Sequence, residues 1–180
     1  MKTFFTSDMH FGHTNILKYD NRPFTDIREH DETLIKNWNE VAHKDDTIYF
    51  LGDFSLTRNE ISEIIMKHLN GRKFFIKGNH DTKGTISLYQ KYGTYLGQLD
   101  EITINKQHIV LCHYKMCVWN RSHYGSWHLF GHSHGGIPDD QNSLSLDVGI
   151  NCHNYYPIEF EEVKKLMEAK NFKPKTKRNE

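Results

Sequence analysis

Short runs of apolar, β-branched and aromatic residues recur along the chain and predict buried strands. Six runs have this character, and a seventh segment is expected to form a hairpin with the fourth run: Thr3–Thr6, Thr47–Leu51, Lys73–Ile76, His108–Leu111, Trp127–Phe130, Leu144–Val148 and Gln98–Ile104. Helical periodicity lies between and after them, at Asp26–His43, Asn59–Leu69, Thr85–Tyr92 and Glu159–Lys170. Early alternation of strands and helices, followed mostly by strands, predicts an α/β protein with a mixed sheet or two packed sheets.

Length and charge limit what kind of protein this is. The 180 residues fit one domain, expected at 1–171, with a flexible basic tail at 172–180. Lys plus Arg and Asp plus Glu both total 23, a balance that demands neither a nucleic-acid nor a membrane partner. We expect neither a bilayer-spanning segment nor a signal peptide, and the three cysteines lack metal-site spacing. We therefore expect a reduced, cytoplasmic protein.

Five of the predicted strands are followed by residues that bind metals. In chain order these residues are Asp8 and His10, then Asp53, then Asn79, His80 and Asp81, then His113, then His132 and His134. Ligands bind at the carboxyl edge of open α/β sheets, so residues far apart in sequence are expected to meet there. Imidazole, carboxylate and amide donors suit divalent cations, and the absence of cysteine disfavours a structural zinc. Each motif alone also fits a capped turn, but together they offer enough ligands for two ions that share a carboxylate.

The order of these motifs resembles the calcineurin-like metallophosphoesterase superfamily. The matching residues are Asp8-Met9-His10, Gly52-Asp53, Gly78-Asn79-His80-Asp81, His113 and Gly131-His132-Ser133-His134. The resemblance implies a four-layer α/β/β/α sandwich of two mixed sheets flanked by helices, with metals at the strand ends. It implies a first ion held by Asp8, His10, Asp53 and His134, and a second held by Asp53, Asn79, His113 and His132.

The same resemblance implies hydrolysis of a phosphate ester by a metal-bridging hydroxide, with His80 protonating the leaving group. We expect two divalent ions, Mn²⁺ in the first place and Fe, Ni, Zn or Mg as alternatives. Asp81 is expected to orient the His80 imidazole and raise its pKa, unless it is a turn or cap residue. The expected substrate is a small phosphodiester or phosphomonoester, nucleotides included, because the chain has no room for an added specificity domain.

Three residues outside the shared motifs are candidates for substrate binding. The stretch around His13 and Arg22 resembles a subgroup of small prokaryotic and phage phosphoesterases. Arg22 is expected to pair with a phosphate oxygen or, alternatively, with a surface acid or a helix end. Arg121 lies in the aromatic, basic loop Tyr114–Ser126, which either lines the pocket or packs onto the domain. Asp147 is a candidate to hydrogen-bond a ligand histidine.

Two other functions compete with this prediction. A metal-dependent nuclease acting on DNA or RNA would need a basic channel, which the neutral balance of charge disfavours. A non-catalytic interaction module of the same fold is disfavoured by the intact set of ligands.

Overall fold

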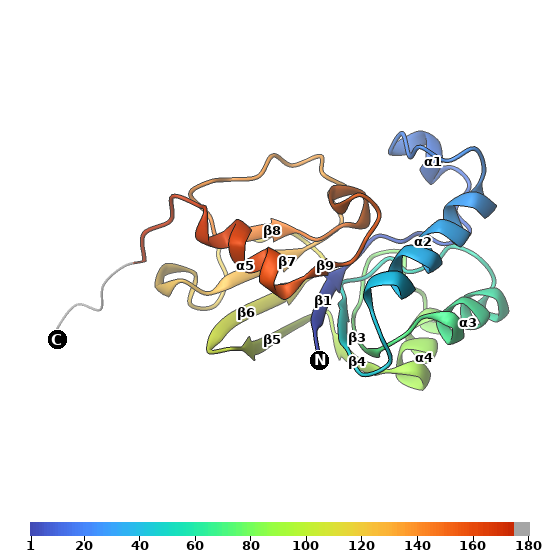
Figure 1. Ribbon diagram of the computed structural model, residues 1–180, viewed down its shortest axis with the longest axis horizontal. Coiled ribbons are helices and arrows are strands. Elements are labelled where there is room, and N and C mark those ends of the chain that lie inside the picture. The colour runs from blue at the N-terminus through green and yellow to red at the C-terminus, as the bar shows by residue number, and fades with distance from the viewer. Residues whose placement is uncertain (175–180) are drawn as a thin grey trace.

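The computed structural model describes residues 1–174, and these form two β-sheets (Figure 1). The first sheet has the strand order β4-β3-β2-β1-β9 and the second has the order β5-β6-β7-β8. The strands are β1 (Thr3–Thr6), β2 (Thr47–Phe50), β3 (Arg72–Ile76), β4 (Thr94–Gly97), β5 (Leu99–Ile104), β6 (Gln107–Cys112), β7 (Trp127–Phe130), β8 (Ser145–Asp147) and β9 (Ile158–Glu159). Strands β1 to β4 are parallel and β9 is antiparallel to β1, whereas β5 is antiparallel to the parallel set β6, β7 and β8. Both sheets are therefore mixed.

Helices flank the two sheets. They are α1 (Ile16–Tyr19), α2 (Ile27–Val41), α3 (Asn59–His68), α4 (Lys83–Tyr92) and α5 (Phe160–Glu168), with 3-10 turns at Ser122–Tyr124 and Ile150–His153. Helices α2, α3 and α4 lie beside the first sheet, and α5 lies beside the second (Figure 1). The predicted sandwich of two mixed sheets flanked by helices is confirmed.

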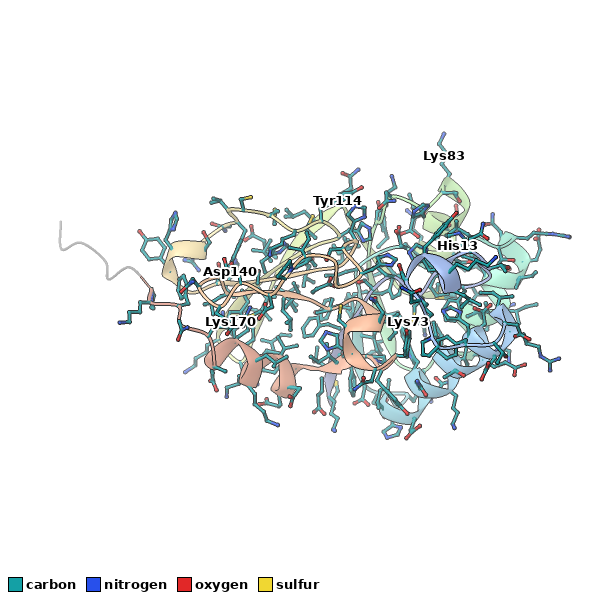
Figure 2. The ribbon with its side chains drawn as sticks, turned by 90° about the horizontal axis from the view of Figure 1, so that it is seen from above. His13, Lys73, Lys83, Tyr114, Asp140 and Lys170 are labelled. Carbon is teal, nitrogen blue, oxygen red and sulfur yellow. The ribbon has the colours of Figure 1, made fainter. Side chains whose placement is uncertain are left out.

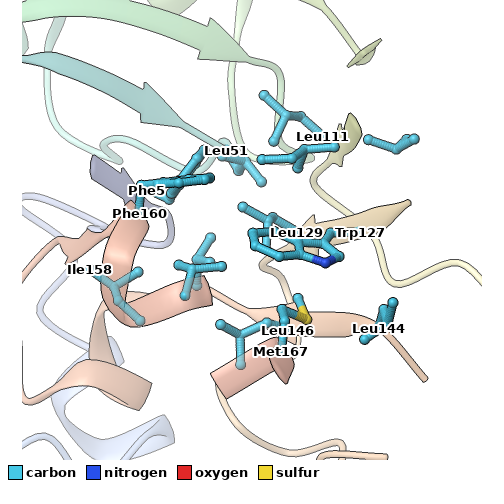
Figure 3. Close-up of a cluster of buried hydrophobic side chains, with 14 of the residues drawn as sticks. Phe5, Leu51, Leu111, Trp127, Leu129, Leu144, Leu146, Ile158, Phe160 and Met167 are labelled. Carbon is cyan, nitrogen blue, oxygen red and sulfur yellow. The ribbon is translucent and has the colours of Figure 1, made fainter. Parts of the chain in front are cut away.

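The core has two parts because neighbouring residues of a strand point to opposite faces. Phe4 of β1 packs with Leu34 and Trp38 of α2, between the first sheet and its helices. The adjacent Phe5 packs with Leu111 and Leu129 of the second sheet, as Figure 3 shows. One strand thus joins both cores, and this fixes how the two sheets face each other.

Most of the predicted elements are present, with differences at their ends. Helix α4 begins two residues earlier than predicted, because Thr82 caps it by accepting a hydrogen bond from the Thr85 amide (3.3 Å). The predicted hairpin is confirmed as β5 and β6, which pair along their full length. Strand β4 was not predicted: its residues are exposed or half-buried, so the apolar signal is weak. The last helix begins one residue later than predicted, at Phe160, because Glu159 ends the short strand β9.

The predicted tail begins within the described residues. The Asn171 amide donates a hydrogen bond to the Gln141 carbonyl (2.8 Å), and Phe172 packs against the core between the sheets. Residues 175–180 of the predicted tail lie outside the described residues. Within residues 1–174, every helix is too short or too polar to cross a membrane.

Candidate metal centre

The loops that follow five strands bring the predicted metal ligands together. They come after β1, β2 and β3 of the first sheet and after β6 and β7 of the second. The side chains form two groups, in each of which the candidate ligand atoms all lie within 4.8 Å of one another: Asp8, His10 and His134, and Asp53, His113 and His132. Each group therefore combines residues from both sheets.

In the first group, His134 lies at the spacing of a shared cation from both partners, while His10 Nε2 and Asp8 Oδ1 are 3.9 Å apart. Asp8 Oδ1 lies 3.4 Å from His134 Nε2, and the Nε2 atoms of His10 and His134 are 3.2 Å apart. Two ligands about 2.1 Å from one ion, at ordinary coordination angles, stand about 3.0–3.4 Å apart. Asp8 Oδ1 is buried and has no hydrogen-bond partner among the described residues. A buried carboxylate oxygen facing two imidazoles fits a metal ligand, and the residues present suit a divalent cation.

Asp53 connects the two groups. Its Oδ2 atom lies 3.7 Å from His10 Nε2 in the first group and 3.4 Å from His113 Nε2 in the second. Asn79 joins the second group, with its Oδ1 atom 3.0 Å from His113 Nε2. One carboxylate oxygen thus faces both groups, as a ligand shared by two ions would.

Neighbouring groups fix the direction of these side chains. His113 Nδ1 donates to the Leu51 carbonyl (2.7 Å), which leaves Nε2 as the nitrogen that faces the centre. Asp8 Oδ2 accepts hydrogen bonds from the Ser7 hydroxyl (2.6 Å) and the His132 amide (2.9 Å). The second oxygen of Asp53, Oδ1, accepts the His80 amide (2.8 Å). In each carboxylate one oxygen is held by the protein while the other faces the centre.

The backbone at the ligand positions is strained. Five candidate ligands have positive φ angles, which non-glycine residues rarely adopt: Asp8 (59°), His10 (53°), Asp53 (62°), His132 (65°) and His134 (47°). Each costs about 1–2 kcal/mol and persists because the surrounding structure enforces it. Close packing is part of that enforcement, since a Cβ at Gly131 would collide with the Ser7 and Asp8 side chains.

The electrostatics of the first group favour a cation. Burial lowers the pKa of His10 to about 3, so its imidazole is neutral at pH 7, as a metal ligand must be. Burial also opposes protonation of His134, but its hydrogen bond to Asp20 and the nearby Asp8 carboxylate outweigh burial and raise its pKa to about 10. Two carboxylates around His134 therefore attract positive charge, and a proton there competes with a metal ion.

Comparisons with known proteins show which proteins this chain is similar to in sequence and in fold. No family model matches the chain. An uncharacterized protein of Methanocaldococcus jannaschii, MJ1445, is 34% identical over 174 residues, which cover 93% of this chain and 92% of that protein. The structure of AQ665 from Aquifex aeolicus, a protein of unknown function, has a TM-score of 0.71 at 24% identity, covering 92% of this chain and 98% of its own. An archaeal phosphodiesterase has a TM-score of 0.50 at 17% identity, covering 83% and 84%.

The chain shares the fold of the archaeal phosphodiesterase structure. It also belongs to one family with the Methanocaldococcus protein, which it matches over nearly the whole length of both chains.

Arg22 is buried, and of its two predicted roles the pairing with an acidic side chain is the one the structure shows, whereas the contact with a phosphate is not. Its guanidinium donates to the backbone carbonyls of Asp8 (2.9 Å) and Met9 (3.1 Å) and to Asp20 Oδ2 (3.2 Å). Asp20 in turn accepts a hydrogen bond from His134 Nδ1. The role of Asp20 was not predicted, because no strand precedes it and its partner lies 114 residues away. Arg22 and Asp20 together support the first group, Arg22 through the Asp8 carbonyl and Asp20 through His134 Nδ1.

The hydrogen bonds of Asp81 fit its alternative prediction, a turn or cap residue. Its carboxylate accepts the backbone amides of Gly78 (2.7 Å), Asp53 (3.1 Å) and Phe54 (3.2 Å), so the prediction that it orients the His80 ring is wrong. Burial raises the pKa of Asp81. The residue joins the loops after β2 and β3 and thereby positions Asp53.

Asp147 binds a loop. The prediction that it hydrogen-bonds a ligand histidine is wrong. It accepts hydrogen bonds from the Ser133 hydroxyl (2.5 Å) and the Gly135 amide (3.1 Å), on both sides of His134.

His13 and His80 lie at the rim of the centre. The His80 ring is 5.4 Å and the His13 ring 5.7 Å from the His10 ring, measured between centroids. His80 Nε2 lies 4.0 Å from Asp53 Oδ2, and 44% of its side chain is exposed. Both imidazoles are therefore within reach of a ligand bound at the metal centre.

Arg121 lies far from the metal centre, so its predicted contact with a substrate bound there is wrong. It lines a cavity of about 610 Å³ with Gln107, the first residue of β6, whereas His113 follows the last. Six residues of strand span about 20 Å. The loop from residue 114 to 126 runs along this length and packs through buried Trp119, whose Nε1 donates to the Ser126 carbonyl (3.2 Å).

Tyr114, at the near end of that loop, is a residue of the site that sequence reasoning did not single out. Its ring centroid lies 4.8 Å from that of His132. Figure 2 labels Tyr114 and also His13, whose ring neighbours are His132 and His10, respectively. Its position directly after His113 was the available signal.

Proposed function

We propose that this protein is a metal-dependent phosphoesterase that hydrolyses a small phosphodiester or phosphomonoester at a dinuclear centre. The observation that carries the proposal is the position of Asp53 Oδ2 between His10 Nε2 (3.7 Å) and His113 Nε2 (3.4 Å). The activity named for the archaeal structural neighbour, a phosphodiesterase, agrees with it.

The donor set would hold two ions. One has the ligands Asp8, His10, Asp53 and His134, and the other has Asp53, Asn79, His113 and His132. When bound, the ions supply charge stabilisation for the phosphate oxygens and a nucleophile drawn from water. Mn²⁺ is the first choice, with Fe, Ni, Zn and Mg as alternatives, because the set mixes imidazole nitrogens with carboxylate and amide oxygens.

His80 is the general acid in this proposal. The hydrogen bond from its amide to Asp53 Oδ1 (2.8 Å) fixes the loop, while the exposed imidazole extends toward the site. A histidine in this position can hold a proton and deliver it to the leaving oxygen. His13, whose ring centroid lies 5.7 Å from that of His10, binds the substrate in this proposal, and its Nδ1 has no hydrogen-bond partner among the described residues.

Exchanging one carboxylate tests the proposal. The Asp53→Asn variant keeps the shape of the side chain but removes the shared negative charge, so it should lose both bound metal and turnover. Asp45→Asn, at an exposed turn before β2, is the matched control and should keep both. Metal content by elemental analysis and hydrolysis of bis-p-nitrophenyl phosphate and p-nitrophenyl phosphate are the measurements. Wild-type rates in Asp53→Asn would refute the dinuclear centre.

Nucleic acid remains the alternative substrate. A nuclease would show cleavage of single-stranded DNA that falls steeply with added salt, whereas turnover of a small ester would change little. A protein that binds both metals and hydrolyses none of these esters would be an interaction module.

A further inference from the structure

A second cavity, of about 270 Å³, opens directly beside the metal centre. Its lining includes Lys77, Asn79, Gln98, Leu99 and Tyr114. Asn79 belongs to both sites, because its Oδ1 atom also lies 3.0 Å from His113 Nε2. The cavity and the second group of ligands therefore share a wall.

Sheet topology fixes the place of this cavity. The Lys77 amide donates to the Gly97 carbonyl (2.8 Å), which ties the end of β3 to the turn between β4 and β5. Leu99, the first residue of β5, pairs with Cys112, the last residue of β6. Because β5 and β6 are antiparallel, the start of β5 lies at the edge of the sheet where the metal ligands are.

Tyr114 gives the cavity an aromatic wall. Its ring meets the His132 ring edge to face, at 4.8 Å and 68°, and the His113 ring at 5.1 Å and 73°. These contacts hold the ring in place, yet 45% of the residue is exposed, as is 47% of Leu99. An aromatic ring held by its neighbours and still open to solvent is a stacking surface for a ligand. Lys77 and Gln98 add an ammonium and an amide to the lining.

We propose that this cavity binds a planar ring, aryl or heteroaryl, carried by the phosphate of the substrate and stacked on Tyr114. The inference rests on the proposed function, because the metal centre must hold the phosphate. The volume lies just below the range of about 300–1,000 Å³ that takes drug-sized ligands, so one ring system fits and a run of nucleotides does not. Gln98 and Lys77 reach the polar edge of a nucleobase, which a simple aryl ring lacks.

Binding of phosphonates tests this directly, because their carbon–phosphorus bond resists hydrolysis. The metal-loaded protein is titrated with phenylphosphonate, cyclohexylphosphonate and methylphosphonate in a calorimeter. We expect phenylphosphonate to bind about 5- to 150-fold more tightly than methylphosphonate, as stacking on one aromatic side chain provides. The cyclohexyl compound, similar in size but not planar, should fall between them. Equal affinities for all three would overturn the proposal.

Variants locate the effect. The ratio of phenyl to methyl affinity should approach one in Tyr114→Ala and stay high in Tyr114→Phe, which keeps the ring. This ratio is unaffected by any partial loss of metal, since both ligands use the same centre. Tyr124→Ala, an exposed tyrosine at the far end of the same loop, is the control and should keep the wild-type ratio. An unchanged ratio in Tyr114→Ala would refute the stacking role.

Two further titrations are needed. One distinguishes a nucleobase from a simple aryl ring, and the other distinguishes failure of the cavity proposal from failure of the proposed function. The 5′-phosphonate of thymidine should bind more tightly than phenylphosphonate, and lose that advantage in Gln98→Ala, if the ring is a nucleobase. The reverse order would identify a simple aryl ester. Inorganic phosphate checks the metal centre itself: if it binds but the phosphonates show no preference, the cavity proposal fails and the proposed function stands. If it does not bind, both fail.

Discussion

Replacing Arg22 by lysine should destabilise the protein and weaken its first metal site. The guanidinium makes five hydrogen bonds, to the carbonyls of Asp8 and Met9, to His30 Nε2 (2.8 Å) and twice to Asp20. A lysine ammonium keeps the charge but has one nitrogen, so it cannot reach groups on several sides. At least two buried partners would lose their donor.

The size of the effect follows from those lost partners. A buried acceptor left without a donor costs about 1–3 kcal/mol, so Arg22→Lys should lower the free energy of unfolding by about 2–4 kcal/mol. Arg22→Ala also removes the charge beside Asp20 and should cost about 3–5 kcal/mol or more. Domains are stable by about 5–15 kcal/mol, so the lysine variant should still fold. Because Arg22 contacts Asp8 and supports His134 through Asp20, affinity for the first ion should fall about 10- to 100-fold.

Urea unfolding of the metal-free protein and metal titration of the folded protein are the assays. Arg28→Lys is the matched control, because Arg28 is exposed and pairs with Glu32 one helical turn away. It should unfold like the wild type. An Arg22→Lys variant within about 0.5 kcal/mol of wild type, the size of ordinary surface substitutions, would refute the structural role given to the guanidinium.

Two other results are expected. His80→Ala should keep both metals and lose about 10²- to 10⁴-fold in turnover, with a larger loss for alkyl than for p-nitrophenyl leaving groups; equal losses would argue against a general acid. Metal affinity should rise with pH from 6 to 9, by about tenfold per unit for one displaced proton, and a flat profile would contradict this. Burial lowers the pKa of His134, but Asp20 and Asp8 raise it by more, to about 10. Below that pH the imidazole is protonated, so an incoming ion must displace its proton. Asp20→Asn should flatten the profile.

The sequence predicted the candidate ligands that follow strands and missed the residues that support them. Asp8, Asp53 and His113 each follow a short apolar run, and the carboxyl ends of parallel strands share one edge, so their convergence could be predicted. Asp20 follows no strand, and its contact with His134 depends on how two distant loops pack. Nothing in the local sequence marks such a pair.

The wrong predictions share a physical cause. Asp81 was assigned to His80 because the two are adjacent, but neighbours in a loop point in different directions, and the carboxylate turns to backbone amides. Arg121 was placed at the site because its loop links two ligand-bearing strands, yet such a loop must span a whole strand length. Arg22 was expected to pair with a phosphate because guanidinium matches that geometry, but buried carbonyls and the Asp20 carboxylate already occupy its donors.

The mixed origin of the two ligand groups has a consequence for assembly. Asp8, His10 and Asp53 come from the first sheet, and His113, His132 and His134 come from the second. A cation in either group would act as a cross-link between the two layers of the sandwich. Neither half of the molecule alone offers a complete coordination sphere, so metal capture has to wait until the sheets have docked, and the ions would then oppose their separation.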